Sequence, residues 1–334
     1  MTISNTRVLL TRRPDVIATP DCFAVETEEL APLEPGQVRV GVEYISVDAG
    51  TRTMLEGEGF HQQVGVGDTI LAGGVGRVID SADDNWAVGQ AVRGGLGAQT
   101  VATVTATDLE PIDESIAPLP AWLGVLGGST GVTAWIGMRR VAQPKPGDVF
   151  VVSAAAGAVG SIAGQIAKRD GATVIGIAGG PEKVTYLTEQ LGFDGAIDYK
   201  NENVGERLRE LAPKGVNIFY DNVGGPILDA VLDQLAMRAK VVICGAVSQY
   251  NNMDKIVGPS MYLRLAERQS VMEGFAYFHF PESIAPATEE LAGWLKDGSL
   301  KFSEEILDGI ERFPEALEFM FSGGNIGKLL VKAG

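Results

Sequence analysis

Cysteine and histidine are scarce in this sequence, and each shortage excludes a class of protein. The 334 residues include two cysteines, Cys22 and Cys244, and two histidines, His61 and His279. Two cysteines cannot build a disulfide framework, and nothing indicates an oxidising compartment. A four-cysteine zinc site is excluded, and a catalytic one would need both cysteines and a histidine to converge. No Ser/His/Asp hydrolase signature is present either. We therefore expect a protein that binds no metal.

Positive charge is also in short supply. The chain has 27 Lys and Arg against 43 Asp and Glu, so its formal net charge is −16. Because an acidic surface repels phosphate backbones, we expect no nucleic-acid partner. An anionic ligand of this protein must be held by locally placed cations and backbone N–H groups.

Long Leu/Ile/Val runs are missing too. Ser115–Met138 carries no charge and is long enough to cross a bilayer, but it contains Pro118, Pro120 and several glycines. We expect buried helices that join two domains, and no membrane partner. Residues 1–20 have no apolar core of the signal-peptide type, which favours a cytoplasmic location.

What is present is typical of a globular chain with room for two domains. Hydrophobic residues make up 45% of it and charged residues 21%. In the first third, apolar residues largely alternate over Gln37–Asp48, and Gly76–Asp80 and Gln99–Val104 are further short strand candidates. This region predicts a small β-barrel or sandwich.

From Gly147 onward, strand patterns alternate with helix patterns. The pattern predicts strands at Val149–Ser153, Thr173–Ala178, Ile218–Asp221, Val241–Cys244 and near Gly274–Phe278. It predicts helices at Ser161–Asp170, Glu182–Leu191, Gly205–Ala212, Pro226–Gln234 and Ser260–Gln269. Such alternation is typical of a doubly wound parallel sheet. The tail adds a helix-like stretch, Phe313–Phe321, and a strand-like end, Gly327–Lys332.

A glycine turn follows the first of these strands. Ala155-x-Gly157-x-x-Gly160 resembles a dinucleotide fingerprint with alanine at its first position, and a helix pattern comes directly after it. Such a turn brings backbone N–H groups and a helix N-terminus close to a pyrophosphate. The alternative is a tight strand–helix turn in another α/β fold.

The residues after the second strand bear on the choice of cofactor. An acid that selects NAD would stand near Ala178, where Ala178, Gly179 and Gly180 offer no side chain for the ribose hydroxyls. Lys183 can approach a 2′-phosphate as a point charge. Its alternative is a solvated lysine, although the first turn of a helix is mildly unfavourable for a cation. These residues favour NADPH.

Further candidates stand at the carboxyl ends of the later strands, where such sheets bind ligands. Asn222 follows one strand, Gly245–Tyr250 the next, and Phe275–Tyr277 lies at the last. For Asn222 the alternative is an ordinary Asx turn before two glycines.

Taken together, these motifs resemble the zinc-independent medium-chain dehydrogenase/reductases, in the branch of prostaglandin reductase, alkenal double-bond reductase and curcumin reductase. The matching motifs run from about residue 120 to the C-terminus. They are Ser153-Ala-Ala-Ala-Gly-Ala-Val-Gly-Ser161, Gly179-Gly-Pro-Glu-Lys183, Leu191-Gly-Phe-Asp194, Asp198-Tyr-Lys200, Tyr220-Asp-Asn-Val-Gly-Gly225, Cys244-Gly-Ala-Val-Ser-Gln-Tyr-Asn251, Met272-Glu-Gly-Phe275 and Asn325-Ile-Gly-Lys328.

The resemblance implies a GroES-like β domain over residues 1–122 and 311–334, and a Rossmann domain over residues 123–310 that forms a homodimer. It also implies that Lys183 and Tyr199 share the 2′-phosphate of NADPH. The implied cofactor residues are Gly157, Ala158, Val159, Gly160, Lys183, Tyr199, Asn222, Cys244, Gly245, Ala246, Val247, Ser248, Gln249, Tyr250, Phe275, Ala276, Tyr277 and Asn325.

One departure from the family concerns the first domain. Relatives usually have V-D-P-Y-M-R where this chain has Val47-Asp48-Ala49-Gly50-Thr51-Arg52. The missing aromatic side chain at Gly50 is expected to widen or reshape the substrate pocket. No single relative's substrate is therefore transferable.

The reaction that the resemblance implies is reduction of a carbon–carbon double bond conjugated to a carbonyl. Hydride goes to the β-carbon, and hydrogen-bond donors hold the resulting enolate because no metal is expected. Tyr250 is the candidate proton donor, with solvent as the alternative, while Arg52 and Tyr262 are weaker candidates. Two other functions stay open: a quinone reductase of the same superfamily, and a non-catalytic NADPH-binding protein.

Overall fold

The computed structural model describes residues 3–57 and 61–334, which form two compact units. The first unit comprises Met1–Gly124 and Glu304–Gly334, and the second is Val125–Ser303. The C-terminal segment belongs to the first unit because its strands join the sheet there. β14, Glu304–Asp308, pairs with β15, Lys328–Lys332, which in turn pairs with β3, Gln37–Ser46.

The first unit is β-rich, as the alternating pattern predicts, and it has the GroES-like fold. In its described part, one sheet runs in the order β14-β15-β3-β4-β5-β7, with β6 also on β3, and β1 pairs with β2. Val38, Val40 and Val42 alternate along β3 and are buried in its core. The remaining elements are β1 Ser4–Leu10, β2 Phe23–Glu29, α1 Gly50–Met54, β4 Gly74–Ser81, β5 Ala91–Gly94, β6 Val101–Thr105, β7 Leu109–Pro111 and α9 Phe313–Phe321.

The second unit is the predicted doubly wound sheet. Six strands of the described chain pair in parallel in the order β10-β9-β8-β11-β12-β13, so the order reverses between β8 and β11. The strands are β8 Val149–Ser153, β9 Thr173–Ala178, β10 Gly195–Asp198, β11 Val216–Asp221, β12 Leu235–Ile243 and β13 Val271–Gly274. β8 is buried from Phe150 to Ser153, as expected of a strand with both faces covered.

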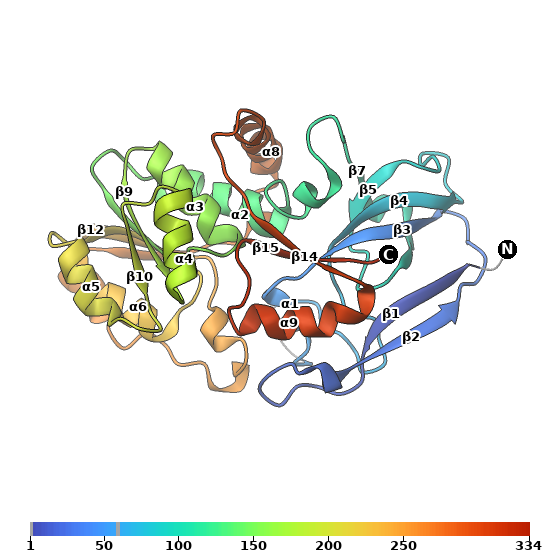
Figure 1. Ribbon diagram of the computed structural model, residues 1–334, viewed down its shortest axis with the longest axis horizontal. Coiled ribbons are helices and arrows are strands. Elements are labelled where there is room, and N and C mark those ends of the chain that lie inside the picture. Colours follow the sequence, from blue (N-terminus) through green and yellow to red (C-terminus); the bar gives the residue numbers. More distant parts are fainter. Residues whose placement is uncertain (1–2, 58–60) are drawn as a thin grey trace. The chain divides into compact units, whose positions relative to one another are not determined.

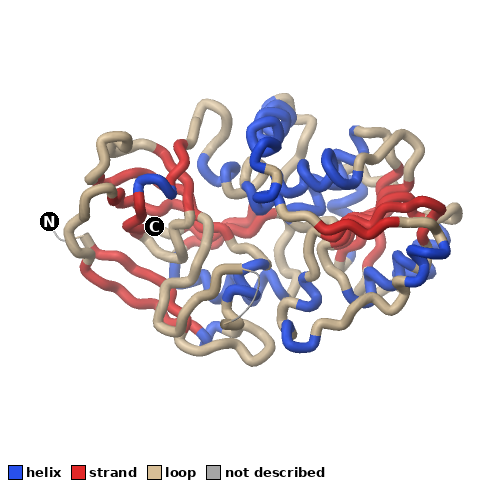
Figure 2. The backbone as a smooth tube through the Cα atoms, turned by 180° about the vertical axis from the view of Figure 1, so that it is seen from behind, coloured by secondary structure: helices blue, strands red, loops and turns tan. Residues whose placement is uncertain are grey.

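Helices cover both faces of this sheet (Figure 1). α2 packs with both α3 and α8, and α5 packs with α6. Figure 2 shows the helices of this unit above and below its strands. Their bounds are α2 Thr133–Ile136, α3 Ala158–Arg169, α4 Pro181–Thr185, α5 Val204–Leu211, α6 Gly225–Leu232, α7 Leu263–Glu267 and α8 Pro281–Lys296.

Some elements differ from the sequence prediction. α8 was not predicted, although Ala287, Leu291 and Trp294 recur at helical spacing and are buried. Pro286, which lacks the N–H that a helix interior needs, obscures that spacing. The short strand β10 was not predicted either. The helix predicted at Ser260–Gln269 is only α7, and β13 ends at Gly274, so Phe275–Tyr277 follow the strand.

From Leu119 onward, the uncharged segment forms mostly buried helical turns, as predicted. Leu119–Trp122 form a short 3₁₀ turn, and α2 lies between two π-helical turns, Gly128–Val132 and Gly137–Ala142. Among the described residues, no helix is long and apolar enough to cross a membrane.

Two helical glycines provide a matched test of packing in the second unit. A Cβ at Gly164 of α3 would lie 2.1 Å from Cζ of the buried Phe193, whereas a Cβ at Gly293 of α8 would meet nothing within 4 Å. We expect Gly164→Ala to lower the free energy of unfolding by about 1–3 kcal/mol through overpacking. Gly293→Ala should raise it by about 0.5–1 kcal/mol. Chemical unfolding followed by circular dichroism measures both, and equal shifts would contradict the close contact between α3 and Phe193.

Candidate functional site

The glycine turn brings the start of α3 very close to the end of β8. The N–H of Gly157 donates to the carbonyl of Ala154 at 2.9 Å. A Cβ at Gly160 would lie 2.4 Å from that same carbonyl oxygen, so only glycine permits this approach. No side chain caps the helix at Gly157. The N–H groups of its first turn, Ala158 to Gly160, can therefore bind an anion.

An acidic side chain lies near the end of β9, but its oxygens are used by the backbone. The Asp198 carboxylate accepts the N–H of Gly180 at 2.7 Å and that of Lys200 at 3.1 Å. It also accepts the side-chain amide of Asn201 at 2.7 Å. These bonds, chiefly the one from Gly180, lower the pKa of Asp198. The carboxylate thus fixes the loop after Ala178.

A tyrosine and a lysine lie over this loop. A Cβ at Gly179 would be 2.9 Å from Cε1 of Tyr199 and 2.9 Å from Cε of Lys200. Lys183 is half-buried in α4, which begins just after the loop at Pro181. Lys200 was not predicted as a site residue. Its position directly after Tyr199 in the same motif could have indicated a second cation for the 2′-phosphate.

The loops after β11 and β12 carry the next group of candidates. Asn222 does not form the simple Asx turn that was its alternative. Its side-chain amide donates instead to the carbonyl of Ser153 at 2.8 Å, across the point where the strand order reverses. The second loop contains Cys244, Gly245, Ala246, Val247, Ser248, Gln249 and Tyr250, and its hydrogen bonds to the first loop hold the two together.

Tyr250 folds back over its own loop. Its hydroxyl oxygen accepts the N–H of Ala246 at 3.2 Å, and a Cβ at Gly245 would lie 3.1 Å from that oxygen. Because the hydroxyl is the acceptor, it keeps its own hydrogen for donation. Burial raises the pKa of Tyr250; the hydrogen bond from Ala246 opposes this shift, and the nearby Cys244 and Asp221 add to it. The phenol therefore stays protonated at neutral pH.

The thiol of Cys244 is held in its neutral form. Burial raises its pKa to about 12, and the neighbouring Asp221 acts in the same direction. A hydrogen bond with the Tyr220 hydroxyl opposes this shift. A neutral thiol is a poor nucleophile, so Cys244 is not suited to covalent catalysis.

The aromatic residues after β13 pack against glycines of the helical segment 128–142. A Cβ at Gly137 would lie 2.6 Å from Cζ of Phe275, and one at Gly128 would lie 2.8 Å from Cε2 of Tyr277. Phe275 also makes an edge contact with Tyr220, at 6.3 Å between ring centroids. These rings, with Ala276 between them, therefore have a packing role whatever else they contact.

Three further candidates, the implied cofactor residue Asn325 and the weaker candidates Arg52 and Tyr262, have other surroundings. In the first unit, the side-chain amide of Asn325 donates to the carbonyl of Gly327 at 3.0 Å. The buried Arg52 donates to the carbonyl of Val16 at 2.9 Å, which is a structural contact. In the second unit, Tyr262 is 58% exposed.

The position that lacks the family's aromatic side chain is covered by a histidine. A Cβ at Gly50 would meet Cε1 of His61 at 3.7 Å. Nδ1 of His61 lies 2.6 Å from the hydroxyl of Thr53, and burial lowers the pKa of the imidazole. His61 is therefore held over Gly50, and its lowered pKa favours the neutral imidazole at neutral pH.

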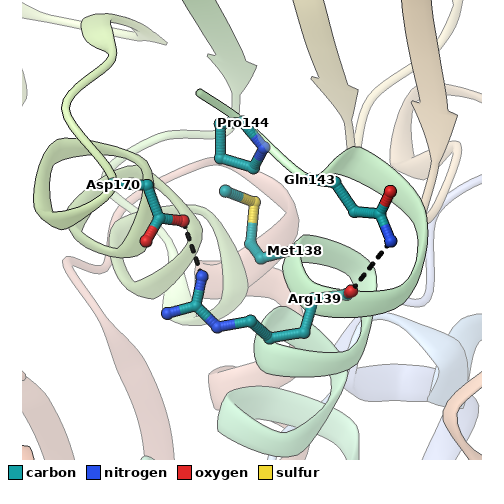
Figure 3. Close-up of a pocket in the computed structure, with 5 residues that line it drawn as sticks. All are labelled: Met138, Arg139, Gln143, Pro144 and Asp170. Atoms are coloured by element: carbon teal, nitrogen blue, oxygen red, sulfur yellow. Dashed lines mark hydrogen bonds and ion pairs between the residues drawn. The ribbon is translucent and has the colours of Figure 1, made fainter. Parts of the chain in front are cut away.

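A separate surface pocket of about 320 Å³ lies elsewhere in the second unit (Figure 3). The guanidinium of Arg139 points to Asp170 at 2.6 Å, and the amide of Gln143 donates to the carbonyl of Arg139 at 3.4 Å. Met138 and Pro144 complete the lining. Pro144 precedes β8 and Asp170 precedes β9, so this pocket is at the amino ends of the strands, opposite the glycine turn.

Comparisons with known families cover both units. Residues 6–112 match the family model "N-terminal domain of oxidoreductase", and residues 158–292 match "Zinc-binding dehydrogenase". Over residues 3–57 and 61–334, no group of three His, Cys, Asp or Glu side chains could hold a metal ion.

Individual relatives match over nearly the whole chain. The NADPH-dependent curcumin reductase of Escherichia coli is 34% identical over 98% of this chain and 96% of its own length. The NADP⁺-dependent 2-alkenal reductase of Nicotiana tabacum is 36% identical over 86% of this chain and 84% of its own. The crystal structure of CurA from Vibrio vulnificus in complex with NADPH superposes with a TM-score of 0.92, at 31% identity over 98% of this chain and 99% of that one. This chain belongs to the medium-chain dehydrogenase/reductase superfamily, in the branch of the prostaglandin, alkenal and curcumin reductases.

Proposed function

We propose that this protein is an NADPH-dependent reductase of carbon–carbon double bonds conjugated to an aldehyde or ketone. The observation that carries the proposal is the Tyr250 hydroxyl, which accepts a backbone N–H and keeps its own proton at the carboxyl edge of the parallel sheet. The relatives named for curcumin and 2-alkenal reduction support the same substrate class.

The described residues fit an NADPH molecule. The uncapped start of α3 behind Gly157 suits its pyrophosphate, and Lys183, Tyr199 and Lys200 suit the 2′-phosphate. The acid Asp198 is already bonded to the backbone and offers little to a ribose hydroxyl pair. When bound, NADPH supplies the hydride for the β-carbon of the substrate.

Tyr250 has the properties of a hydrogen-bond donor and general acid. Hydride addition to an enone leaves negative charge on the enolate oxygen, which must be stabilised without solvent reorganisation. A tyrosine hydroxyl is protonated at neutral pH, and the raised pKa of Tyr250 does not change this, so its hydrogen can be directed to this oxygen or to the α-carbon. The alternative is that solvent supplies the proton and Tyr250 only packs against the cofactor.

The other features of the proposal follow from the sequence and from the family. The reaction proceeds without a metal, with NADPH bound by residues of the second unit: Gly157–Gly160, Lys183, Tyr199, Asn222, Cys244–Tyr250 and Phe275–Tyr277. The role of Asn325, in the first unit, stays a prediction from the resemblance. A homodimer and a cytoplasmic location stay predictions.

One assay separates this function from its alternatives. NADPH oxidation is followed by absorbance with a 2-alkenal, an enone and a quinone, and the products are identified by mass spectrometry. We expect saturated aldehydes and ketones. Activity on quinones alone would favour a quinone reductase, and tight NADPH binding without turnover would favour a non-catalytic protein.

Removing one hydroxyl tests the role of Tyr250. Tyr250→Phe should lower kcat for an enone about 100-fold, the usual contribution of a general acid, and leave the Kd for NADPH within about threefold. Tyr186→Phe removes a hydroxyl of the same unit that lies 3.1 Å from the hydroxyl of Ser303 and outside the candidate site, so it is the matched control and should change neither value. An unchanged kcat in Tyr250→Phe would remove the phenol from the chemistry.

A second substitution tests cofactor selection. Lys183→Ala should weaken NADPH binding about 10-fold or more and leave NADH binding unchanged, because a charge-assisted contact contributes about 1.5–3 kcal/mol. Lys214→Ala removes an exposed lysine just before β11, at the opposite edge of the sheet, and serves as the control. Equal losses of affinity for NADPH and NADH would show that Lys183 does not recognise the 2′-phosphate.

The thiol of Cys244 provides a prediction of pH dependence. The thiolate is the reactive form, and a pKa of about 12 leaves only about one thiol in ten thousand ionised at pH 8. Alkylation of Cys244 should therefore be far slower than that of a free cysteine and rise about tenfold per pH unit up to pH 11. Mass spectrometry after iodoacetamide treatment measures it, with Cys244→Ala as the control. Rapid alkylation that levels off near pH 9 is the contrary result.

A further inference from the structure

Two buried polar side chains join the strands at the point where the strand order reverses. Ser153 ends β8, Asp221 ends β11, and both are 0% exposed. The hydroxyl of Ser153 donates to Oδ1 of Asp221 at 2.7 Å. The two neighbouring strands are already paired through their backbones. The main effect of this additional hydrogen bond is therefore to fix the loops that follow the strands.

The Asp221 carboxylate is satisfied by donors of the first loop. It accepts the N–H of Val223 at 2.9 Å and that of Gly224 at 3.0 Å. No cation pairs with it in the part of the chain that the structure describes. A buried carboxylate without a counterion depends on such donors, so its position and the path of the loop fix each other.

Ser153 holds the same loop from the other strand. Its hydroxyl oxygen accepts the N–H of Asn222 at 2.8 Å, and its carbonyl accepts the side-chain amide of Asn222 at 2.8 Å. The hydroxyl of Ser153 thus donates to Asp221 and accepts from the N–H of Asn222. Neither Ser153→Ala nor Asp221→Asn can preserve this pattern of hydrogen bonds.

The second loop is attached to the first at its start. The carbonyl of Asp221 accepts the N–H of Cys244 at 2.9 Å and that of Gly245 at 3.2 Å. These two residues directly follow β12 and open the loop that ends at Tyr250.

Further along, the two loops remain bonded to each other. The N–H of Val247 donates to the carbonyl of Asn222 at 3.1 Å, and that of Ser248 donates to the carbonyl of Val223 at 3.1 Å. The hydroxyl of Ser248 donates to the same carbonyl at 2.6 Å. A displacement of the first loop must therefore move the second one and Tyr250 with it.

We propose that Ser153 and Asp221 are positioning residues that set the two loops, and through them the nicotinamide half of the cofactor site and Tyr250. The adenosine half lies at β9 and β10, on the other side of the reversal, and none of the hydrogen bonds described above for this pair reaches those strands. The inference rests on the proposed binding of NADPH.

The test compares a whole cofactor with its adenosine half. In Ser153→Ala and Asp221→Asn, the Kd for NADPH should rise about 10-fold, and kcat for an enone should fall at least as much. The Kd for adenosine 2′,5′-bisphosphate should stay within about twofold. Ser283→Ala removes a hydroxyl that is equally buried, 0% exposed, but bonded to Arg140 in another part of the unit. This control should leave all three values unchanged.

The two ligands separate the outcomes. Equal losses of affinity for NADPH and the bisphosphate would mean a general loosening of the unit, and no loss of NADPH affinity would mean that the pair has no positioning role. Either result overturns the inference. If the unsubstituted protein reduces no enone, the proposed function fails, but the ratio of the two dissociation constants still decides the role of Ser153 and Asp221.

Discussion

The close approach of chain segments at the carboxyl edge of the parallel sheet is the constraint on which the site depends. β8 and β11 are neighbours, and their crossovers leave in opposite directions. Gly160 lets α3 contact the turn after β8, while Ser153 and Asp221 hold the loop after β11. An uncapped helix start and two mutually bonded loops are thereby placed along one edge.

The electrostatic design follows from the acidity of the chain. A protein of formal net charge −16 has no general field that attracts an anionic cofactor, so attraction must be local. In our proposal, the backbone N–H groups at the uncapped start of α3 provide it, together with Lys183 and Lys200. The nearby carboxylates of Asp198 and Asp221 accept hydrogen bonds from backbone N–H groups. These bonds stabilise the negative charges and hold the loops in place.

Much of the fold was predictable because its signals are local. The strands β8 and β9 have the bounds that their apolar runs predicted, and the glycine turn follows from its spacing. α8 was missed because Pro286 obscures the helical spacing of Ala287, Leu291 and Trp294, and β10 was missed because it has only four residues. The roles of Ser153 and Asp221 were not predictable, since their bond joins residues 68 positions apart. Sequence spacing carries no such information.

The central claim is that hydride goes to the carbon–carbon double bond. Incubation of the protein with NADPH deuterated at the transferred position of the nicotinamide and with a 2-alkenal or enone tests it most directly, with product analysis by mass spectrometry and NMR. Our account predicts a saturated aldehyde or ketone with deuterium on the β-carbon. Deuterium on the carbonyl carbon of an allylic alcohol, with the double bond intact, would contradict it.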